Sequence, residues 1–429
     1  MTQRDQPPDQ SASRGPRTAP PLRRLGQSGA AHSVAAGFLG WTLDAFDFFV
    51  VVFLYDTLAA DFHVSKGKII ATVGYTLAMR PLGALLFGLL ADRYGRRTPL
   101  IANVLFFSAM EVACGFAPNY ATFAVLRTIF GIGMGGEWGV GSSLAMEAAP
   151  PRWRGMLSGI VQSGYSLGYL LAAIAARVIL PHWGWRAMFW SGAAPALLAL
   201  YIRTKVPESK AWQQHRLPDF GAIIKTVAQN APGFGYLVLL MVLMTFLSHG
   251  TQDLYPDFLT TAHGFATATA ANVAILYNVG AILGAIVFGQ ISERFGRRRG
   301  ILAALALSLV VIPLWAFGAR LATLALGAFL MQAGVQGAWG VIPAHVNELA
   351  PDAARGLMPG FAYQLGILFG SPVNSIEHNL YHRFGYQWAL GSFEVVNIIL
   401  LTIVVALGAE RRGRSFVRNE TVPVADKSG

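Results

Sequence analysis

The sequence predicts an all-α membrane protein in which twelve transmembrane helices form two pseudo-symmetric bundles of six. Its 429 residues are 54% hydrophobic and only 13% charged, whereas soluble domains carry about 25% charged residues. Apolar runs of about 20 residues, each long enough to cross a bilayer as a helix, recur along the chain. The runs are continuous rather than alternating, so helices are favoured over a β-barrel. The chain is therefore predicted to lie in a lipid bilayer.

The apolar runs fall into two sets of six predicted spans, separated by a polar linker over 207–232. The first bundle, 33–206, contains predicted spans at 33–58, 69–91, 99–117, 121–148, 155–180 and 186–206. The second bundle, 233–409, contains predicted spans at 233–261, 269–292, 299–319, 321–349, 356–378 and 386–409. Residues 1–32, rich in Pro, Ser, Gln and Arg, and residues 410–429 are predicted to be disordered tails.

The basic residues are distributed as membrane topology requires, not as in a nucleic-acid-binding protein. The net charge is +11, and of the 33 Lys and Arg residues, 25 lie in the tails, the linker and the loops on their side. Only six lie in the opposite loops. Because basic loops stay in the cytoplasm, we expect both termini and the linker to be cytoplasmic. The expected location is the plasma membrane, as in a bacterial inner membrane, with no nucleic-acid partner.

The two halves of the chain repeat. "GLLADRYGRR" begins at Gly88 and "GQISERFGRR" begins at Gly289, an offset of 201 residues. The same offset carries Glu147 onto Glu348 and the dipeptide at 154–155 onto that at 355–356. Matches at a single offset indicate duplication. Two parallel six-helix repeats would place a binding site near the middle of the bilayer, between the halves.

Ionisable residues inside predicted spans are candidate functional groups, because each costs at least about 2.5–3.5 kcal/mol in the bilayer. Asp44 and Asp47 are three residues apart, so they share one face of the first span. Arg80 lies at the centre of the second span. It is expected to pair with one of these acids, to receive a substrate carboxylate with its planar guanidinium, or to exchange one for the other. Arg127 and Glu137 in the fourth span are predicted to pair, in a structural or gating role.

The segment "SHGTQDLYP", beginning at Ser248, places three polar side chains in one turn of the seventh span. His249 and Asp253 are four residues apart and therefore adjacent on a helix. Asp253 in apolar surroundings would hold a proton near neutral pH, and His249 would hydrogen-bond it or relay the proton. Gln252 supplies a donor and an acceptor. Gly250 and Pro256 suggest a locally broken helix.

Neutral polar residues add to the candidate site. Asn278 in the eighth span and Tyr363 and Gln364 in the eleventh are expected either to bind a substrate hydroxyl or to tie helices together. The single cysteine, Cys114, lies in an apolar run. With no metal-ligand spacing, nucleophile elbow or phosphate loop, the sequence predicts no metal, no cofactor and no enzymatic activity.

The doubled "GLLADRYGRR" motif, "RTIFGIGMGGEWG" and "VPESKAW" together resemble the major facilitator superfamily over about residues 33–409. The resemblance implies that the repeated loop is a cytoplasmic latch. Gly88 would allow close helix approach, and Asp92 would pair with a neighbouring Arg and a helix N-terminus. Glu293 takes the place of Asp92 in the second copy. The predicted gating residues of the loops are Gly88, Asp92, Arg93, Gly95, Arg96 and Glu293.

A narrower resemblance lies in "SHGTQDLYP", which is similar to the signature Asn-x-x-Ser/Thr-His-x-Ser/Thr-Gln-Asp-x-x-x-Thr of the sialate:proton symporter family, lactate/pyruvate permease branch. Thr245 stands where the pattern has Asn, and Asp257 where it has Thr. The resemblance implies that His249 and Asp253 handle the proton. It also implies that Arg80 and Gln364 bind the substrate carboxylate. The two departures concern the substrate rather than the proton.

We therefore expect a monomeric, proton-coupled importer of short monocarboxylates, with lactate or pyruvate as cargo. Its partners would be a small organic anion, a proton and the lipid bilayer. Asp44 and Asp47 would join His249 and Asp253 in proton coupling. An alternative cargo is sialic acid or an aromatic, shikimate-like acid, and a more distant alternative is a membrane sensor with a transporter fold.

Overall fold

The computed structural model describes residues 29–217 and 219–417, and the regular structure of these two ranges is helical throughout. Within them, nine helical segments are long and apolar enough to cross a membrane. They coincide with nine of the twelve predicted spans, and helices also occupy the other three, 121–148, 186–206 and 356–378. The prediction of an all-α membrane fold is confirmed. The predicted tails at 1–28 and 418–429 lie outside the described residues.

The first half of the chain has six predicted spans, two of which are built from more than one helix. The first span bends at Phe53–Leu54, where α2 gives way to α3, and the sixth is divided into α8 and α9. The helices are α2 (Ala30–Val52), α3 (Tyr55–Asp61), α4 (Lys66–Tyr94), α5 (Arg97–Gly115), α6 (Tyr120–Ala148), α7 (Arg154–Val178), α8 (Leu180–Trp190) and α9 (Ala194–Lys205).

The linker and the second half follow the same plan. The seventh span breaks after Gln252, as predicted, and continues as α13 and a short π-helix at Phe258–Ala262. The eleventh span is divided at Ser371–Pro372, which the sequence pattern did not indicate. The helices are α10 (Lys210–His215), α11 (Phe220–Gln229), α12 (Ala231–Gln252), α13 (Tyr255–Asp257), α14 (Thr267–Phe295), α15 (Arg297–Phe317), α16 (Leu321–Leu349), α17 (Met358–Gly370), α18 (Val373–Phe384) and α19 (Tyr386–Leu407).

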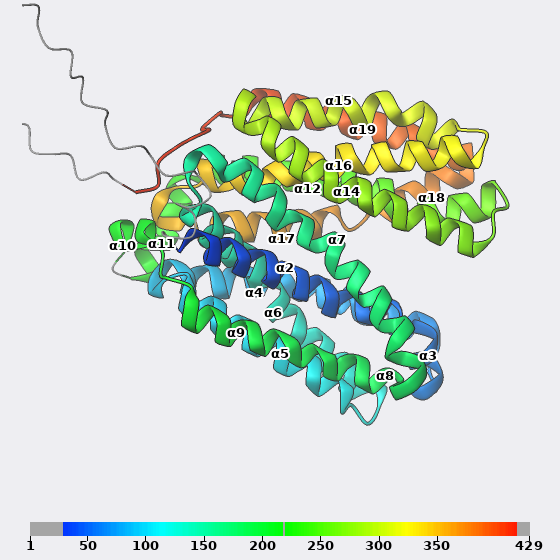
Figure 1. Cartoon of the computed structure of the whole chain (residues 1–429), viewed down its shortest axis with the longest axis horizontal. Helices are drawn as coiled ribbons and strands as arrows, with labels where there is room; N and C mark the ends of the chain where they lie inside the picture. Colours follow the sequence, from blue (N-terminus) through cyan, green and yellow to red (C-terminus); the bar gives the residue numbers. More distant parts are fainter. Residues whose placement is uncertain (1–28, 218, 418–429) are drawn as a thin grey trace, which may run out of the picture.

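The two halves lie side by side (Figure 1). They meet where α7 packs against α14 and α16, and where α4 and α6 pack against α17. The linker helices α10 and α11 and both ends of the described chain lie at one end of the molecule. We call this the basic end, and it also carries the repeated loops at 94–97 and 295–298. The other end, which carries α3 and the α18–α19 turn, is called the opposite end.

Glycines allow the halves to approach each other closely at the basic end. A Cβ built on Gly155 of α7 would lie 2.6 Å from the carbonyl oxygen of Gly289 on α14, and a Cβ on Gly289 would lie 2.5 Å from that of Gly155. These distances are shorter than a side chain tolerates, so only glycine permits this crossing of two backbones. The contact brings α7 and α14 together beside the two repeated loops.

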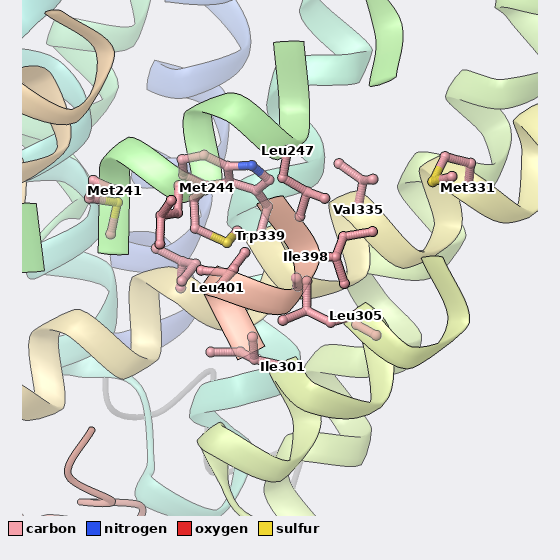
Figure 2. Packing of buried hydrophobic residues seen from close by; sticks show 14 of the residues in the cluster. Met241, Met244, Leu247, Ile301, Leu305, Met331, Val335, Trp339, Ile398 and Leu401 are labelled. Atoms are coloured by element: carbon pink, nitrogen blue, oxygen red, sulfur yellow. The ribbon is translucent and has the colours of Figure 1, made fainter. Parts of the chain in front are cut away.

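The core of the second half fixes α12, the helix that carries the predicted proton-handling residues. Figure 2 shows Met244 and Leu247 of α12 with Ile398 and Leu401 of α19 around Trp339 of α16. These residues are 3% exposed or less. Between helices in a bilayer, close van der Waals packing of such side chains holds the helices together. Because this face of α12 is held in the core, its other face can present polar side chains to the space between the halves.

Many large apolar side chains are exposed on the outside of the helices. Leu82 and Leu86 of α4, Leu197 of α9 and Val310 of α15 are 46–75% exposed. A water-soluble monomer rarely shows so much continuous apolar surface. The outward apolar residues therefore fit lipid contact and a multi-pass membrane protein.

The N-terminal tail ends earlier than predicted, and part of the predicted C-terminal tail is ordered. Helix α2 starts at Ala30, inside the segment expected to be disordered. Residues 410–417 pack on the basic end: Phe416 is 3% exposed, and its ring lies 3.9 Å from the guanidinium carbons of both Arg154 and Arg355. The expectation of disorder is therefore wrong for 410–417, because cation–π contacts and hydrogen bonds hold this polar segment.

Candidate functional site

A cavity of about 540 Å³ lies between the two halves, nearer the opposite end. Its walls come from α2, α4 and α7 of the first half and from α12, α14, α16, α17 and α18 of the second. Aromatic rings form much of the first-half wall, and most polar side chains come from the second half. The polar lining residues include His249, Gln252, Asp253, Asn278, Gln332, Gln336 and Asn374.

His249 and Asp253 meet in this cavity as their spacing predicts. Nδ1 of His249 lies 2.9 Å from Oδ2 of Asp253. Asn374 of α18 donates its side-chain amide to the same carboxylate oxygen at 3.0 Å. The side chains of His249 and Asp253 are 35% and 29% exposed, so the pair faces the cavity rather than lipid or the helix core. A proton that enters the cavity therefore has direct access to both groups.

The hydrogen bonds correct one detail of the expectation for Asp253. Two donors converge on one oxygen of this carboxyl, and donors favour the charged form of an acid. The acid is thus not kept neutral by apolar surroundings alone. His249 and Asp253 instead form one coupled unit that can exist as an imidazolium–carboxylate pair or take up a further proton.

Several lining residues had not been singled out in the sequence. Asn374 follows the break at Ser371–Pro372, and the break turns α18 so that this amide reaches Asp253. Gln332 of α16 donates to the hydroxyl of Thr251 at 3.0 Å, which ties α16 to α12 behind the cavity wall. Isolated Gln and Asn residues in apolar helices gave no signal that distinguished lining from helix packing.

A small side pocket extends from the cavity toward Tyr363. Trp41, Tyr165 and Trp339 line it together with Tyr363. Arg80 lies behind Tyr363, with its guanidinium carbon 5.8 Å from the centre of that ring. Arg80 is 4% exposed, and its Nε and Nη2 have no hydrogen-bond partner among the described residues. Unsatisfied buried donors of this kind require an explanation.

Arg80 forms no ion pair with Asp44 or Asp47 among the described residues. The ion pair expected between Arg80 and one of these acids is therefore absent among the described residues. The donors of Arg80 remain available to an anion.

The structure places Asp44 and Asp47 inside the first half. Both are 0% exposed, and neither lines the cavity or the side pocket. Asp47 and Glu111 of α5 both lie against Gly192. On α2 it is Phe48, Phe49 and Val52 that face the cavity. Asp44 and Asp47 therefore lie away from the cavity, and the apolar residues of α2 line it.

Arg127 and Glu137 do not pair. They are ten residues apart on α6, which separates them by about 15 Å along a helix axis. Arg127 instead donates Nη1 to Glu111 of α5 at 2.6 Å, and both side chains are 0% exposed. Glu137 is also buried, with no hydrogen-bond partner for its carboxyl oxygens among the described residues. The pair Arg127–Glu111 ties α5 to α6, and Glu111 had not been singled out.

The substitution Arg127→Met is expected to destabilise the protein by about 3–5 kcal/mol, because it leaves the Glu111 carboxylate buried and unpaired. Thermal unfolding in detergent would measure the effect. Arg177→Met, which removes an exposed charge of α7, is the matched control. The double substitution Arg127→Met with Glu111→Leu should recover much of the loss. A melting temperature for Arg127→Met equal to that of the Arg177 control would contradict the pairing.

The remaining predicted binding residues lie at different depths. Asn278 lines the cavity, although its amide also donates to the carbonyl oxygen of Ala274 at 2.9 Å. Gln364 is 0% exposed and donates to the carbonyl oxygen of Gly135 at 3.3 Å. Its Oε1 has no partner in the described part of the chain. Gln364 thus links α17 to α6 and lies outside the cavity lining.

The repeated loops meet the opposite half at the basic end. Asp92 accepts hydrogen bonds from Arg96 at 2.5 Å and from the backbone N–H groups of Gly356 and Leu357 at 2.8 and 3.0 Å. These N–H groups belong to the N-terminal end of α17. In the second copy, Glu293 pairs with Arg297 at 3.0 Å and accepts from the N–H of Gly155. Each loop thus holds the start of a helix from the other half.

The other predicted gating residues of this loop differ in their contacts. Gly88 lies directly against Leu357, where a Cβ would be 2.8 Å from the backbone. Gly95 has a φ of 104°, a conformation that glycine adopts readily, and lies against Glu208. The charge of Arg93 lies 5.4 Å from the ring of its neighbour Tyr94, so this residue belongs to the loop surface.

Four buried ion pairs join the loops symmetrically. Arg96 and Arg355 pair with Glu147 at 2.9 and 3.2 Å. Arg297 and Arg154 both pair with Glu348 at 2.9 Å. The contacts of Arg355 and Arg154 cross between the halves. The basic end is therefore closed while the cavity lies toward the opposite end, as in a transporter that exposes its site to one side at a time.

The substitution Gly155→Ala is expected to weaken closure of the basic end, because the added methyl would collide with the Gly289 carbonyl. Overpacking of this kind costs about 1–3 kcal/mol, a shift of roughly 5- to 150-fold between conformations. A cysteine introduced at Val52, which lines the cavity, should then react more slowly with a thiol reagent. Gly67→Ala is the control, because its Cβ would be 4.0 Å from the hydroxyl oxygen of Ser65, its nearest neighbour. Equal reaction rates in both variants would refute the effect.

Comparisons with known proteins agree with this geometry. The sequence model of a family described as "Sugar (and other) transporter" matches residues 33–222 and 234–408. The carboxylic acid transporter protein homolog of Saccharomyces cerevisiae is 31% identical over 375 residues, covering 81% of this chain and 61% of that protein. The sialic acid transporter NanX of Escherichia coli is 28% identical over 375 residues, covering 86% of this chain and 92% of that protein. The structure of the proton:xylose symporter XylE bound to 6-bromo-6-deoxy-D-glucose has a TM-score of 0.70 at 20% identity, covering 91% of this chain and 98% of that one.

Proposed function

The chain belongs to the sugar (and other) transporter family of the major facilitator superfamily, and on this premise we propose that it imports organic acids together with protons. The observation that carries the proposal is the His249–Asp253–Asn374 group, which faces the cavity between the halves. A titratable pair exposed inside a transport cavity is suited to bind a proton there. The named carboxylic acid and sialic acid transporters among the relatives support an acidic cargo.

Proton coupling has a clear physical purpose for an anionic cargo. A carboxylate that enters with one proton carries no net charge, so the membrane potential does not oppose its uptake. The proton would bind the His249–Asp253 pair from the opposite end, which the distribution of Lys and Arg predicts to lie outside the cell. A pH gradient, acidic outside, would then drive accumulation. Asp44 and Asp47, which lie away from the cavity, remain candidates for a supporting role in proton coupling.

The unsatisfied donors of Arg80 are the proposed receptor for the cargo carboxylate. Nε and Nη2 lie on one edge of the planar guanidinium, the geometry that carboxylates bind in a bidentate manner. Arg80 lines neither the cavity nor the side pocket, whereas Tyr363 lines the side pocket 5.8 Å from the guanidinium carbon, so the proposal requires this ring to turn for the carboxylate to reach Arg80. Gln252 and Asn278 are placed to bond other polar atoms of the cargo. Gln364 would act on the carboxylate only after it releases Gly135.

For the cargo itself, short monocarboxylates such as lactate or pyruvate remain our first proposal, on the strength of the "SHGTQDLYP" signature. A second candidate, a larger acid that carries a ring, is favoured by the cavity. Its volume of about 540 Å³ falls within the range of about 300–1,000 Å³ that holds drug-sized ligands. Phe48, Phe49, Tyr165 and Tyr169 line it, and aromatic walls suit an apolar or ring-bearing body.

Uptake into proteoliposomes with an imposed pH gradient would test the proposal. Labelled lactate should accumulate when the outside is acidic, and it should equilibrate without accumulation when a protonophore removes the gradient. Unlabelled pyruvate, sialic acid, shikimate and a neutral hexose would compete for uptake in parallel assays. Competition by sialic acid or shikimate but not by pyruvate would select the second candidate. Gradient-independent uptake, or competition by the hexose alone, would refute proton-coupled acid transport.

A further inference from the structure

Two buried glutamates face each other where α18 and α19 lie against α12, and one of them is on α19, the helix that also supplies Ile398 and Leu401 to the core in Figure 2. Glu377 of α18 and Glu394 of α19 are both 0% exposed. A Cβ built on Gly250 of α12 would lie within 3.1 Å of Oε1 of both residues. The two carboxyl groups therefore point into one space, which a single methyl group would fill and which glycine leaves open.

These carboxyl groups have almost no partners. Both oxygens of Glu377 and Oε1 of Glu394 lack a hydrogen-bond partner in the described ranges. Oε2 of Glu394 accepts one long hydrogen bond, 3.4 Å, from Asn397. Removing an ionised carboxylate from water costs several kcal/mol unless it is paired. Two of them side by side would also repel each other, so such pairs hold a proton between them.

The surrounding helices supply no compensating cation to this space among the described residues. On α12 the neighbouring titratable groups are His249 and Asp253, and the charge of His249 is engaged by Asp253. On α18, His378 and His382 bond each other at the surface, and Arg383 is exposed. Asp257 of α13 bonds Tyr386 of α19. The charged and titratable groups of α15 and α16 lie at the basic end: Arg297, Arg298, Arg299, His345 and Glu348.

The glutamate pair adjoins the wall of the cavity. Asn374, which bonds Asp253, is one helical turn before Glu377 on α18. Gly250, against which both glutamates lie, is three residues before Asp253 and therefore close to it on the same side of α12. His249 and Gly250 are consecutive on α12: His249 lines the cavity, and Gly250 lies against the glutamate pair. The glutamate pair, which does not line the cavity, is thus a nearby acceptor for a proton bound to Asp253.

We propose that Glu377 and Glu394 form a second proton-binding site, which holds one shared proton at rest and takes up a second proton from the His249–Asp253 pair. In this transfer, protonated Asp253 gives its proton to the ionised member of the pair. Asp253 becomes a carboxylate and the pair becomes neutral, so the total charge is conserved. Whether the Glu377–Glu394 pair holds a proton does not depend on the proposed function. The part of this pair in transport does rest on the proposed function.

Infrared difference spectroscopy of the purified full-length protein in lipid, without substrate, would test this site. The variants are Glu377→Gln, Glu394→Gln and the double substitution. Asp56→Asn is the control, because the side chain of Asp56 is 81% exposed and pairs with Lys66 at the opposite end. At neutral pH the wild-type spectrum minus that of the double variant should show the carbonyl-stretch band of a protonated carboxyl, which separates the pair from the buried Asp44, Asp47 and Glu137. Each single variant should shift this band, and the double variant should release about one proton fewer than the wild type on alkaline titration.

The same measurements separate the possible failures. Glutamine closely matches a neutral glutamic acid, so the variants should melt close to the wild type. Gly250→Ala, which keeps both acids but separates them, should shift the band as well. Absence of the band from the difference spectrum and unchanged proton release in the double variant would overturn the proposal, even if transport were lost. If the difference spectrum shows the band but the wild type shows no gradient-driven uptake, the second site stands and the proposed symport falls.

Discussion

Replacement of Asp253 by Asn is expected to abolish accumulation of the cargo against its gradient. Asn keeps the shape of the side chain and can still bond His249 and Asn374, but it cannot alternate between a charged and a neutral state. For electroneutral symport with one proton, each unit of pH difference supports about tenfold accumulation. Under a gradient of about two units, the wild type should approach a ratio of about 100, and the variant should stay near about 1.

The experiment compares uptake with exchange in the same proteoliposomes. Exchange of internal for external cargo needs no net movement of protons, so the Asp253→Asn variant should retain it. Retained exchange would show that the variant is folded and binds its cargo. Asp56→Asn, which neutralises an exposed acid at the opposite end, should accumulate cargo like the wild type. Full gradient-dependent accumulation by Asp253→Asn would exclude this carboxyl from proton coupling.

The second large effect is expected from Arg80→Gln, which should weaken cargo binding severely without weakening the fold. Loss of one partner from a buried charged pair costs about 2–5 kcal/mol, which is a loss of affinity of at least about 30-fold. Arg80→Lys keeps the charge but lacks the planar fork, so it should lie between Gln and the wild type. Equilibrium binding of labelled acid at acidic pH would give the affinities.

Thermal unfolding distinguishes this role from a structural one. In the cargo-free protein Nε and Nη2 of Arg80 are buried without partners, so removal of the charge should leave the melting temperature unchanged or raise it. A purely structural Arg would show the reverse pattern, with lower stability and unchanged affinity. Arg177→Gln on the surface of α7 is the control for the loss of a charge. An unchanged affinity in Arg80→Gln would refute its role as the carboxylate receptor.

The sequence predicted best those features that depend on spacing within one helix or on the internal repeat. His249 and Asp253 meet because residues four apart on a helix are neighbours. The contacts of Asp92 and Glu293 appear in both halves because the loops are copies of each other. The positions of the spans follow from long apolar runs, whose length the bilayer sets.

Contacts between different helices could not be predicted from patterns in the sequence. Arg127 is bonded to Glu111, which lies on a different helix, whereas Glu137 on its own helix is too far away. Asp44 and Asp47 share a face, but apolar periodicity does not indicate which face of a helix buried on all sides borders a cavity. Asn374 reaches Asp253 only because α17 and α18 are separate helices. Glu394 drew no attention because its partner is close in space and not in sequence.

The position of Phe416 offers a way to observe the transport cycle. Its ring contacts Arg154 from one half and Arg355 from the other, each at 3.9 Å. If the halves separate at this end, the ring can remain with at most one of the two guanidinium groups. A fluorine label on this ring would therefore give distinct magnetic-resonance signals for each orientation of the carrier, and their relative intensities would count the two populations in working membranes.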